Sequence, residues 1–482
     1  MSFLLRKQPE PKLSSKDIDP DAVSVLRRLN KSGYVAYLVG GSVRDLLLGR
    51  EPKDFDIATS ASPRQIKNTF RNSFLIGRRF RLALIRFGDK QIETSTFRRC
   101  PESEDMEAAD SSALGGLYQE ADNLFGTPEE DAQRRDFTVN ALFYDVTSSK
   151  IIDYTGGLRD VAKKVLRCIG DPNIRFREDP VRMLRAIRLS ARLDFTIHSD
   201  SAKAIAKHSD EIVQASKPRL FEELTRLFTY NKSEEAFRRL WSSGLMHALL
   251  PRLDEHVAQS GKKKSDLWSF LAALDVTTPH LDGSIKGSPY AISESPLRLA
   301  VLLAPLYLKR CLDESANGRV DALSIAEKLV NEVLVIPFST PSWRIPRFMC
   351  QDTISILESL SYYKSHTIKR NRFFRQDWFY TAMVFWRICA EARDDRTAVS
   401  VIESWEKAFD EFVVEYRPRR QSPDSATPPP ETFESEDEQR DSLFPPKKHS
   451  RRRNRNRRPK SDASGSTEKT EPSNETLQQA EI

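Results

Sequence analysis

The spacing of apolar and polar residues divides the chain into a first part of mixed strands and helices and a longer second part of helices. Residues 37–59, YLVGGSVRDLLLGREPKDFDIAT, contain an apolar strand, a Gly-Gly turn, a short helix over residues 42–48 and a second strand. Within that second strand, a period of two places Asp54 and Asp56 on one face of the sheet. We expect this stretch to form the centre of the first part of the chain.

Further elements are expected on both sides of this stretch. Residues 91–97 alternate like a strand, with Glu93 on the face opposite to Ile92. Caps, turns and periodicity predict the others. They are a helix at 17–32, a helix at 62–72 that begins with a Ser-Pro pair, strands within 74–87, and a hairpin formed by 141–146 and 151–154.

Beyond residue 165 the apolar positions follow a helical period, with short breaks, to about residue 416. Residues 417–482 are rich in Pro, Ser, Glu and Asp and then in Arg, a composition typical of disorder because it cannot bury a core. The acidic residues 100–123 predict a mobile surface loop. We therefore expect an α+β N-terminal domain with a small mixed sheet, an all-α body and a disordered C-terminal tail.

The formal net charge of +7 originates in one short segment. Nine basic residues lie between positions 447 and 460 with no acid among them, and removing these nine charges from +7 leaves −2. A tract of this kind binds nucleic-acid phosphates, and its lack of aromatic residues argues against base stacking there. Alternatives are a nuclear-localisation patch and a role in solubility. The residues expected to bind RNA are Arg451, Arg452, Arg453, Arg455, Arg457 and Arg458.

Length and composition restrict the class of protein. The 482 residues suffice for two or three domains, and 39% of them are hydrophobic. No apolar run approaches the roughly 20 residues that span a bilayer, and the N-terminus lacks a secretory h-region. The five cysteines are scattered without a C-x-x-C spacing, so we expect neither a zinc site nor a disulfide framework. A cytoplasmic protein without membrane insertion is expected.

Asp54 and Asp56 are candidate metal ligands. Two adjacent carboxylates repel each other unless a cation lies between them, and Mg2+ with a triphosphate is the usual solution. Just upstream, Gly40 and Gly41 let backbone N–H groups approach an anion at a helix start. Each signal is weak alone, because Gly-Gly pairs are usually turns and Asp-x-Asp also occurs in calcium sites and solvated loops.

Two later segments carry further candidate chemistry. Residues 134–140, RRDFTVN, offer arginines that bind phosphates and Asp and Asn side chains that can bond ribose hydroxyls. In residues 177–192, four arginines fall on one arc of a helix at about 100° per residue. These are Arg182, Arg185, Arg188 and Arg192. A solvated helix face would explain each segment alone, whereas together they suit a polyphosphate or RNA.

The ordered combination of strand, Gly-Gly, Val-Arg-Asp, linker and Asp-x-Asp resembles the opening of the nucleotidyltransferase domain shared by bacterial poly(A) polymerases and the tRNA CCA-adding enzymes of the same class. The R-R-D-F-T-x-N segment is similar to the same family, as is the E-D-x-x-R element formed by Glu178, Asp179 and Arg182. The resemblance covers about residues 33–250. It implies template-independent nucleotidyl transfer with two Mg2+ ions as cofactor.

The resemblance also implies roles for individual residues. Asp54 and Asp56 would hold the two Mg2+ ions. The third catalytic carboxylate is Asp136 by family likeness, while strand geometry favours Glu93 as its rival. Asp179 and Arg182 would select the base in place of a template strand. The residues implied to bind the nucleotide are Gly40, Gly41, Arg44, Arg135, Asn140, Asp179, Arg182 and Arg185.

Residues 77–80, GRRF, resemble the poly(A) polymerases more than their CCA-adding relatives. We therefore expect a poly(A) polymerase with ATP as substrate and RNA 3′ ends as partner, and no role for DNA. One alternative is a CCA-adding tRNA nucleotidyltransferase. A second is a catalytically silent RNA-binding adaptor, which the intact Asp54 and Asp56 disfavour.

Five regions are expected from these observations. They are an N-terminal extension and helix at 1–32, the nucleotidyltransferase domain at 33–160, a helical neck that binds nucleotide and RNA at 161–255, a helical RNA-binding body at 256–416 and the tail at 417–482. Beyond about residue 250 the resemblance implies only helical structure. Neither the RNA target nor any protein partner follows from the sequence.

Overall fold

The computed structural model describes residues 13–77, 82–99, 124–261, 264–277, 292–316, 318, 320–363 and 370–416. The chain divides into a compact unit, Met1–Arg417, and a second unit, Pro418–Ile482. Three of the expectations lie outside the described residues. They concern the arginines that follow Gly77, the acidic loop at 100–123 and the C-terminal tail with its arginine tract.

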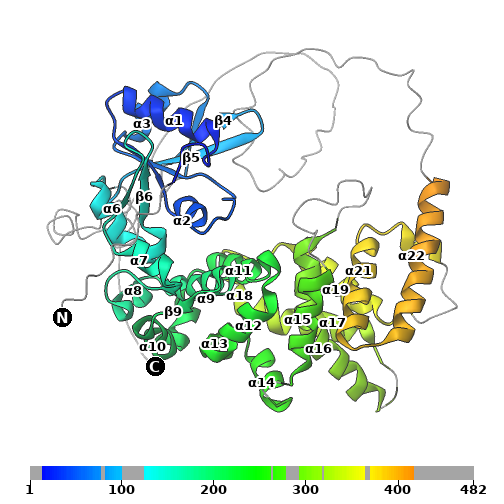
Figure 1. The fold of residues 1–482 in the computed structure, drawn as a ribbon. Coiled ribbons are helices and arrows are strands. Elements are labelled where there is room, and N and C mark those ends of the chain that lie inside the picture. Colours follow the sequence, from blue (N-terminus) through cyan, green and yellow to red (C-terminus); the bar gives the residue numbers. More distant parts are fainter. Residues whose placement is uncertain are drawn as a thin grey trace, which may run out of the picture. The chain divides into compact units, whose positions relative to one another are not determined.

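A seven-stranded sheet forms the frame of the N-terminal domain, with the strands in the order β3-β4-β5-β2-β1-β6-β7. Strands β4, β5 and β6 of this sheet are labelled in Figure 1. β2 and β5 pair in parallel, and the other neighbours within this sheet are antiparallel. The expected hairpin is confirmed as β6 and β7. The strands are β1 (Ala36–Val39), β2 (Ile57–Thr59), β3 (Ser73–Ile76), β4 (Leu82–Phe87), β5 (Lys90–Thr96), β6 (Leu142–Asp145) and β7 (Lys150–Asp153).

Helices accompany this sheet, and their ends follow from capping residues. The expected cap at Ser62 is confirmed, since Ser62 forms a capping box with Gln65 at the start of α3. At the start of α1, Asp19 accepts bonds from the N–H groups of the first turn. Buried side chains of α1 and α3 belong to the same core as Leu38 and Ile57. The helical elements of this domain are α1 (Pro20–Lys31), α2 (Gly41–Leu47), α3 (Pro63–Thr69), α6 (Pro128–Arg134), the 3-10 turn η1 (Thr138–Asn140) and α7 (Gly157–Ala162).

The alternation along the strands separates two cores. Leu38 and Ile57 point to the main core, whereas Val39 and Phe143 point to the opposite face and form a small second core with Ala132 of α6. Asp56 precedes Ile57 and therefore lies on the side of this second core. The active chemistry is thus expected on the face opposite to α1 and α3.

The strand that follows the two aspartates is shorter than predicted. β2 contains Ile57–Thr59, so Asp54 and Asp56 lie in the segment that enters it. The Asp56 carbonyl oxygen still accepts a bond from the Val39 N–H at 3.0 Å, but the partner strand β1 ends at Val39, where the Gly40 turn begins, so the residues before Asp56 have no partner on β1. The prediction of a strand across residues 54–58 is therefore wrong in its extent.

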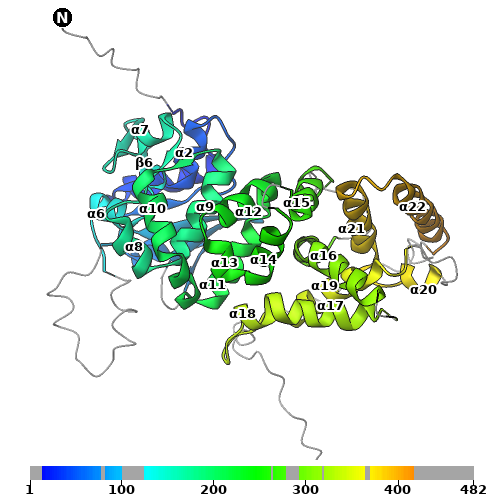
Figure 2. The same ribbon diagram turned by 90° about the horizontal axis from the view of Figure 1, so that it is seen from below.

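Helices make up the rest of the described unit, apart from the short pair β8 (Val165–Leu166) and β9 (Thr196–Ile197). Helix α9 (Val181–Leu193) contacts both α11 and α12 (Figure 2). Its apolar residues Met183, Leu184 and Ile187 are buried. The expected α+β domain and all-α body are thus confirmed. In the described ranges, no helix is long and apolar enough to cross a bilayer.

The other helices of the body are α8 (Pro172–Glu178), α10 (Ser199–His208), η2 (Ser209–Gln214), α11 (Lys217–Arg226), η3 (Thr229–Asn231), α12 (Ser233–Ser242), α13 (Leu245–Leu249), α14 (Pro251–Gln259), α15 (Asp266–Thr277), α16 (Glu294–Ser315), α17 (Ala322–Val330), the π-helical η4 (Asn331–Val335), α18 (Ile336–Phe338), α19 (Arg347–Ser359), α20 (Arg370–Phe374), α21 (Phe379–Ala392) and α22 (Arg396–Tyr416). An aromatic cluster between α21 and α22 includes Phe379, Trp386 and Trp405. Such large buried rings stabilise the C-terminal end of the body.

Candidate active site

A cleft of about 500 Å³ lies where α2 and the residues after α6 meet α9 and α11. Eight arginines and three aspartates line it, so its charge at neutral pH is strongly positive. An open cleft of this charge suits a polyphosphate. The lining residues are Gly40, Gly41, Arg44, Asp56, Arg135, Asp136, Asn140, Asp179, Arg182, Arg185, Arg188, Leu189, Arg192, Arg219 and Arg226.

The backbone of the Gly40–Gly41 turn lies close to the guanidinium groups of Arg135 and Arg44. The sequence predicts a helix that begins at residue 42 with Ser42 as its N-cap, but Gly40 is the N-cap of α2. The φ of Gly40 is 76°, a conformation that glycine adopts easily. A Cβ at Gly40 would lie 3.0 Å from Nη1 of Arg135. A side chain at this position would therefore displace the guanidinium of Arg135.

Arg44 is buried, with 3% of its side chain exposed, and is fixed on both sides. Its Nε and Nη2 donate to Oδ1 of Asp45 at 2.8 and 2.7 Å, and its Nη1 donates to Oδ1 of Asn140. Burial lowers the pKa of Arg44, although the charge of Asp45 opposes this shift. Asp45 therefore keeps a buried cation charged and oriented at the edge of the cleft.

The carboxylates of Asp54, Asp56 and Glu93 lie near the start of β2 with little cationic compensation. The parallel register of Ile57 with Thr94 places Glu93 beside Asp56. Burial, Glu93 and Asp54 together raise the pKa of Asp56 to about 6, and Arg135 only partly opposes them. Concentrated negative charge of this kind fits a divalent cation. Among the described residues, however, no three His, Cys, Asp or Glu side chains form a complete metal site by themselves.

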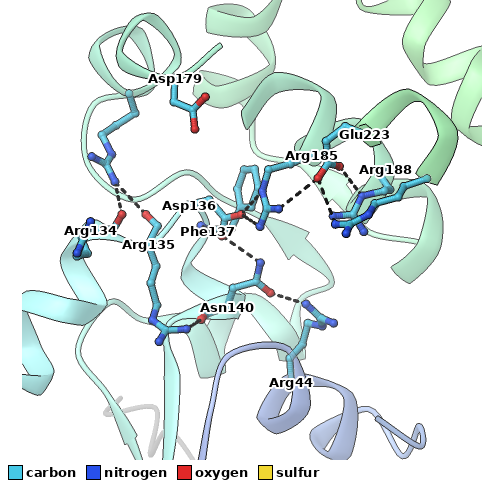
Figure 3. Close-up of polar contacts among 12 residues, drawn as sticks. Arg44, Arg134, Arg135, Asp136, Phe137, Asn140, Asp179, Arg185, Arg188 and Glu223 are labelled. Atoms are coloured by element: carbon cyan, nitrogen blue, oxygen red, sulfur yellow. Dashed lines mark hydrogen bonds and ion pairs between the residues drawn. The ribbon is translucent and has the colours of Figure 1, made fainter. Parts of the chain in front are cut away.

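Both carboxylate oxygens of Asp136 accept hydrogen bonds from neighbouring groups (Figure 3). Its Oδ2 accepts bonds from Nε and Nη2 of Arg185 at 2.9 and 2.7 Å. Its Oδ1 accepts bonds from the Phe137 N–H at 2.8 Å and from Nδ2 of Asn140 at 3.1 Å. Burial alone would raise the pKa of Asp136, but Arg185 and these donors lower it. Asp136 thus joins the N-terminal domain to α9.

The residues expected to read the base are each held by a partner. The carboxylate of Asp179 accepts two bonds from Arg219, at 3.0 Å from Nη1 and 2.7 Å from Nη2. Nη1 of Arg182 donates to the Arg175 carbonyl oxygen at 3.0 Å and to Glu178 at 3.3 Å. Asp179 and Arg182 are therefore held by different partners: Arg219 binds Asp179, while Arg182 is bound by the Arg175 carbonyl oxygen and Glu178.

The arginine stripe predicted on α9 is confirmed, because all four of its arginines line the cleft. Glu223 of α11, with 6% of its side chain exposed, accepts bonds from Nη1 of Arg185 at 3.3 Å and Nε of Arg188 at 2.7 Å (Figure 3). Arg192 donates to Oδ2 of Asp45 at 2.9 Å and lies 4.0 Å above the ring of Tyr230. Glu223 and Asp45, which lie outside the stripe, thus hold arginines of the stripe in position despite their mutual repulsion.

This cleft is lined by every residue that was expected to bind the nucleotide, and also by Asp56 and Asp136. Asp54 and Glu93 are exposed beside it. Sequence reasoning missed Asp45, Arg219, Glu223 and Arg226. A sequence signal for Arg219, Glu223 and Arg226 exists: they are spaced by four and three residues, which places them on one face of the helix α11.

Two family models match the chain over this region. Residues 36–167 match the poly A polymerase head domain, and residues 194–257 match the probable RNA and SrmB-binding site of polymerase A. A Poly(A) polymerase I of Salmonella typhi is 45% identical over 261 residues, which cover 54% of this chain and 56% of the relative. Over these residues the chain is similar to the bacterial poly(A) polymerases. The family resemblance expected from the motifs is therefore confirmed.

The poly(A) polymerase relatives are closer in sequence than CCA-adding ones. A CCA-adding enzyme of Lactobacillus johnsonii is 34% identical over 265 residues, covering 52% of this chain and 63% of that relative. The crystal structure of the Bacillus stearothermophilus CCA-adding enzyme in complex with CTP has a TM-score of 0.57 at 23% identity and covers 83% of each chain. That likeness supports the fold alone. The match to the poly(A) polymerases spans about half of their length.

Proposed function

We propose that this protein is a template-independent polynucleotide adenylyltransferase that adds AMP from ATP to RNA 3′ ends. The observation that carries this proposal is the single cleft that unites the Gly-Gly turn, Asp56, the R-R-D-F-T-x-N segment and Asp179 with Arg182. The identity of 45% to a Poly(A) polymerase I, against 34% to a CCA-adding enzyme, favours ATP over the alternation of CTP and ATP.

The arginines of the cleft suit the triphosphate. Arg44 and Arg135 lie beside the Gly40–Gly41 backbone, where they can bind phosphate oxygens with planar, fixed donors. During transfer, the RNA 3′-oxygen loses its proton and bonds to the α-phosphorus, while the bond to the β,γ-pyrophosphate breaks. Arginines that already face the leaving pyrophosphate stabilise its added charge without reorganising. ATP is the nucleotide substrate in this proposal.

Asp54 and Asp56 are the residues proposed to hold the Mg2+ ions. The charge concentration that raises the pKa of Asp56 makes these carboxylates suitable ligands. Bound Mg2+ would act as a Lewis acid toward the 3′-hydroxyl and the triphosphate. Because Asp136 already accepts four bonds, we propose Glu93 as the third carboxylate and Asp136 as a positioning residue for Asn140 and Arg185.

Base selection is proposed to rest on Asp179 and Arg182. A carboxylate accepts from an amino group on a base edge, and a guanidinium donates to ring nitrogens. Arg219 orients the Asp179 carboxylate through two bonds, so that its direction is set before the nucleotide arrives. Pre-orientation of this kind favours one base edge over others.

RNA is the proposed macromolecular partner, bound by the helical neck and body and by the arginine tract of the tail. The match of residues 194–257 to a probable RNA-binding family supports binding by the neck, and the charge of residues 447–460 supports binding by the tail. A cytoplasmic location would agree with such a role in RNA processing.

An extension assay tests the proposal. Purified protein with Mg2+ receives either a single-stranded RNA of arbitrary sequence or a tRNA that lacks its 3′ end, together with ATP alone or ATP plus CTP. We expect long adenylate tails on the arbitrary RNA with ATP alone. Addition that needs CTP and stops after a few nucleotides on the tRNA would contradict the proposal. Asp56→Asn should abolish extension while RNA binding persists.

A further inference from the structure

A row of side chains leads from the proposed metal ligands to the edge of the sheet. Opposite residues on paired strands share one face, and the register joins Phe74 to Leu84 and Leu84 to Glu93. Glu93 in turn lies beside Asp56. Phe74, Leu84 and Glu93 therefore lie on the same face of the sheet as Asp56. At about 4.8 Å per strand, the row from Asp56 to Phe74 is about 14 Å long.

The outer part of this face is apolar but exposed. Phe74 is 54% exposed and Ile76 is 42% exposed, while Leu82 and Leu84 beside them are only half-buried. Ile76 pairs with Leu82 in the register of β3 and β4, so these four side chains form one continuous surface. Contiguous exposed apolar residues beside an active site mark a binding surface.

Two cations flank the exposed ring of this surface. The guanidinium carbon of Arg86 lies 5.9 Å from the centre of the Phe74 ring, and Nζ of Lys67 lies 5.4 Å from it. Arg86 is separated from Leu84 by one residue and so points to the same face. An aromatic platform with cations beside it is the arrangement that binds the bases and phosphates of a single strand.

We propose that the face formed by Phe74, Ile76, Leu82 and Leu84 binds the last nucleotides of the RNA substrate, with one base stacked on Phe74. This inference rests on the proposed function, because the RNA 3′-hydroxyl must reach Asp54 and Asp56 for the reaction to occur. The cross-strand row is continuous with those carboxylates, and about 14 Å is a distance that a few nucleotides span. Glu93 lies between the two ends, where the 3′-terminal ribose must pass.

The apolar part of the face suits bases, and the two cations suit the phosphates that connect them. β3 is also the outermost strand of the sheet, so a second protein strand could in principle pair with it. Such pairing would use backbone groups and would not need the side chains of β4. Dependence on Leu84 as well as on Phe74 therefore favours RNA.

Adjacent residues of β3 provide a matched pair of variants. Leu75 and Ile76 are each 42% exposed, but they point to opposite faces of the sheet. Ile76→Ser and Phe74→Ala remove part of the proposed surface, whereas Leu75→Ser makes the same kind of change on the other side. All three sites are exposed, so folding should persist, and a thermal melt of each variant checks this.

Binding is measured without ATP, using an oligoadenylate whose penultimate base is 2-aminopurine, whose fluorescence falls when it stacks. We expect the intact protein and Leu75→Ser to quench the probe equally, and Phe74→Ala to lose the quenching. Steady-state extension should show KM for RNA raised about 5- to 100-fold in Phe74→Ala, with KM for ATP unchanged. Ile76→Ser and Leu84→Ser should show smaller increases.

The outcomes separate this inference from the proposed function. If the intact protein extends RNA but Phe74→Ala keeps both its quenching and its KM for RNA, the surface proposal is wrong and the function stands. If no RNA is extended while quenching still depends on Phe74, the surface stands and the function fails. Self-association that Phe74→Ala abolishes, with RNA binding unaffected, would identify a protein interface and overturn the inference.

Discussion

The ion pair between Asp136 and Arg185 connects the sheet domain to α9. Oδ2 of Asp136 accepts both bonds from the arginine, and 11% of the aspartate side chain is exposed. Asp136→Asn removes the charge, and among the described residues Glu223 is then the remaining counter-ion of Arg185. We expect this change to lower the free energy of unfolding by about 1.5–3 kcal/mol at pH 7, measured by urea denaturation.

The same pair has a pH dependence of known sign. The pKa of Asp136 is lowered in the folded protein, so its contribution to stability is present above the pKa of the unfolded chain, about 4. That contribution is lost as the pH falls through the lower folded pKa. The stability difference between the intact protein and Asp136→Asn should therefore shrink below pH 4. Asp210→Asn, an exposed aspartate, is the control, and a difference that grows in acid would contradict this assignment.

Arg219 should act on base selection without touching the reacting atoms. Its side chain is 50% exposed, so its pair with Asp179 contributes about 1 kcal/mol or less. Arg219→Met frees the Asp179 carboxylate to rotate, and we expect KM for ATP to rise up to about fivefold while the preference for ATP over CTP falls. Arg252→Met, which removes an exposed arginine outside the cleft, should leave both values unchanged. Equal kinetics in the two variants would refute the role of Arg219.

At the scale of elements, α2 and α9 are joined through Asp45. Its carboxylate is 4% exposed and binds Arg44 of its own helix with one oxygen and Arg192 of α9 with the other. Asp45→Ala leaves two cations without their partner, and we expect a loss of about 3–5 kcal/mol in unfolding free energy. KM for ATP should also rise, because Arg44 and Arg192 both line the cleft.

A second contact between the same elements separates stability from binding. The exposed Arg50 donates to the Arg192 carbonyl oxygen at 3.0 Å but does not line the cleft. Arg50→Ala should therefore reduce stability slightly and leave KM for ATP unchanged. If Asp45→Ala and Arg50→Ala change KM for ATP alike, Asp45 merely holds the helices together.

At the scale of the whole molecule, the positive charge of the tail should determine how RNA affinity depends on salt. Replacing the six arginines at 451–453, 455, 457 and 458 with serine keeps the length of the tail but removes its charge. Each lost phosphate contact lowers the slope of log K against log salt by about 0.7 for a single strand. We expect weaker RNA binding at low salt and a shallower slope in filter-binding titrations. An unchanged slope would refute the role of the tract.

The cleft also explains how the molecule combines opposite charges. Arginines of α9 and α11 surround Glu223, while Asp136 and Asp45 approach from the sheet domain. The acids hold the arginines in place, and the excess of arginines leaves a positive field for an anionic substrate. Stability and substrate binding therefore depend on the same ion pairs.

Sequence patterns predicted the main elements in their order and most residues of the cleft, but not Arg219 and Arg226. Local signals sufficed for the cap at Ser62, and a helical period sufficed for the arginine stripe of α9, because both depend on neighbours a few residues apart. The resemblance to the family's motifs predicted Gly40, Arg44 and Asp136 as site residues. The extent of the strand before Ile57 was predicted wrongly, because ladder bonding depends on the partner strand.

The tertiary structure decided which partners these residues have. Asp45 and Arg192 are 147 positions apart, and Arg185 and Asp136 are 49 apart, so no local pattern could pair them. The two candidates for the third carboxylate also differ in their surroundings, since Arg185 binds Asp136 while strand register places Glu93 beside Asp56. The periodicity of an element determines the face on which a side chain lies, whereas the tertiary fold determines which residues that side chain contacts.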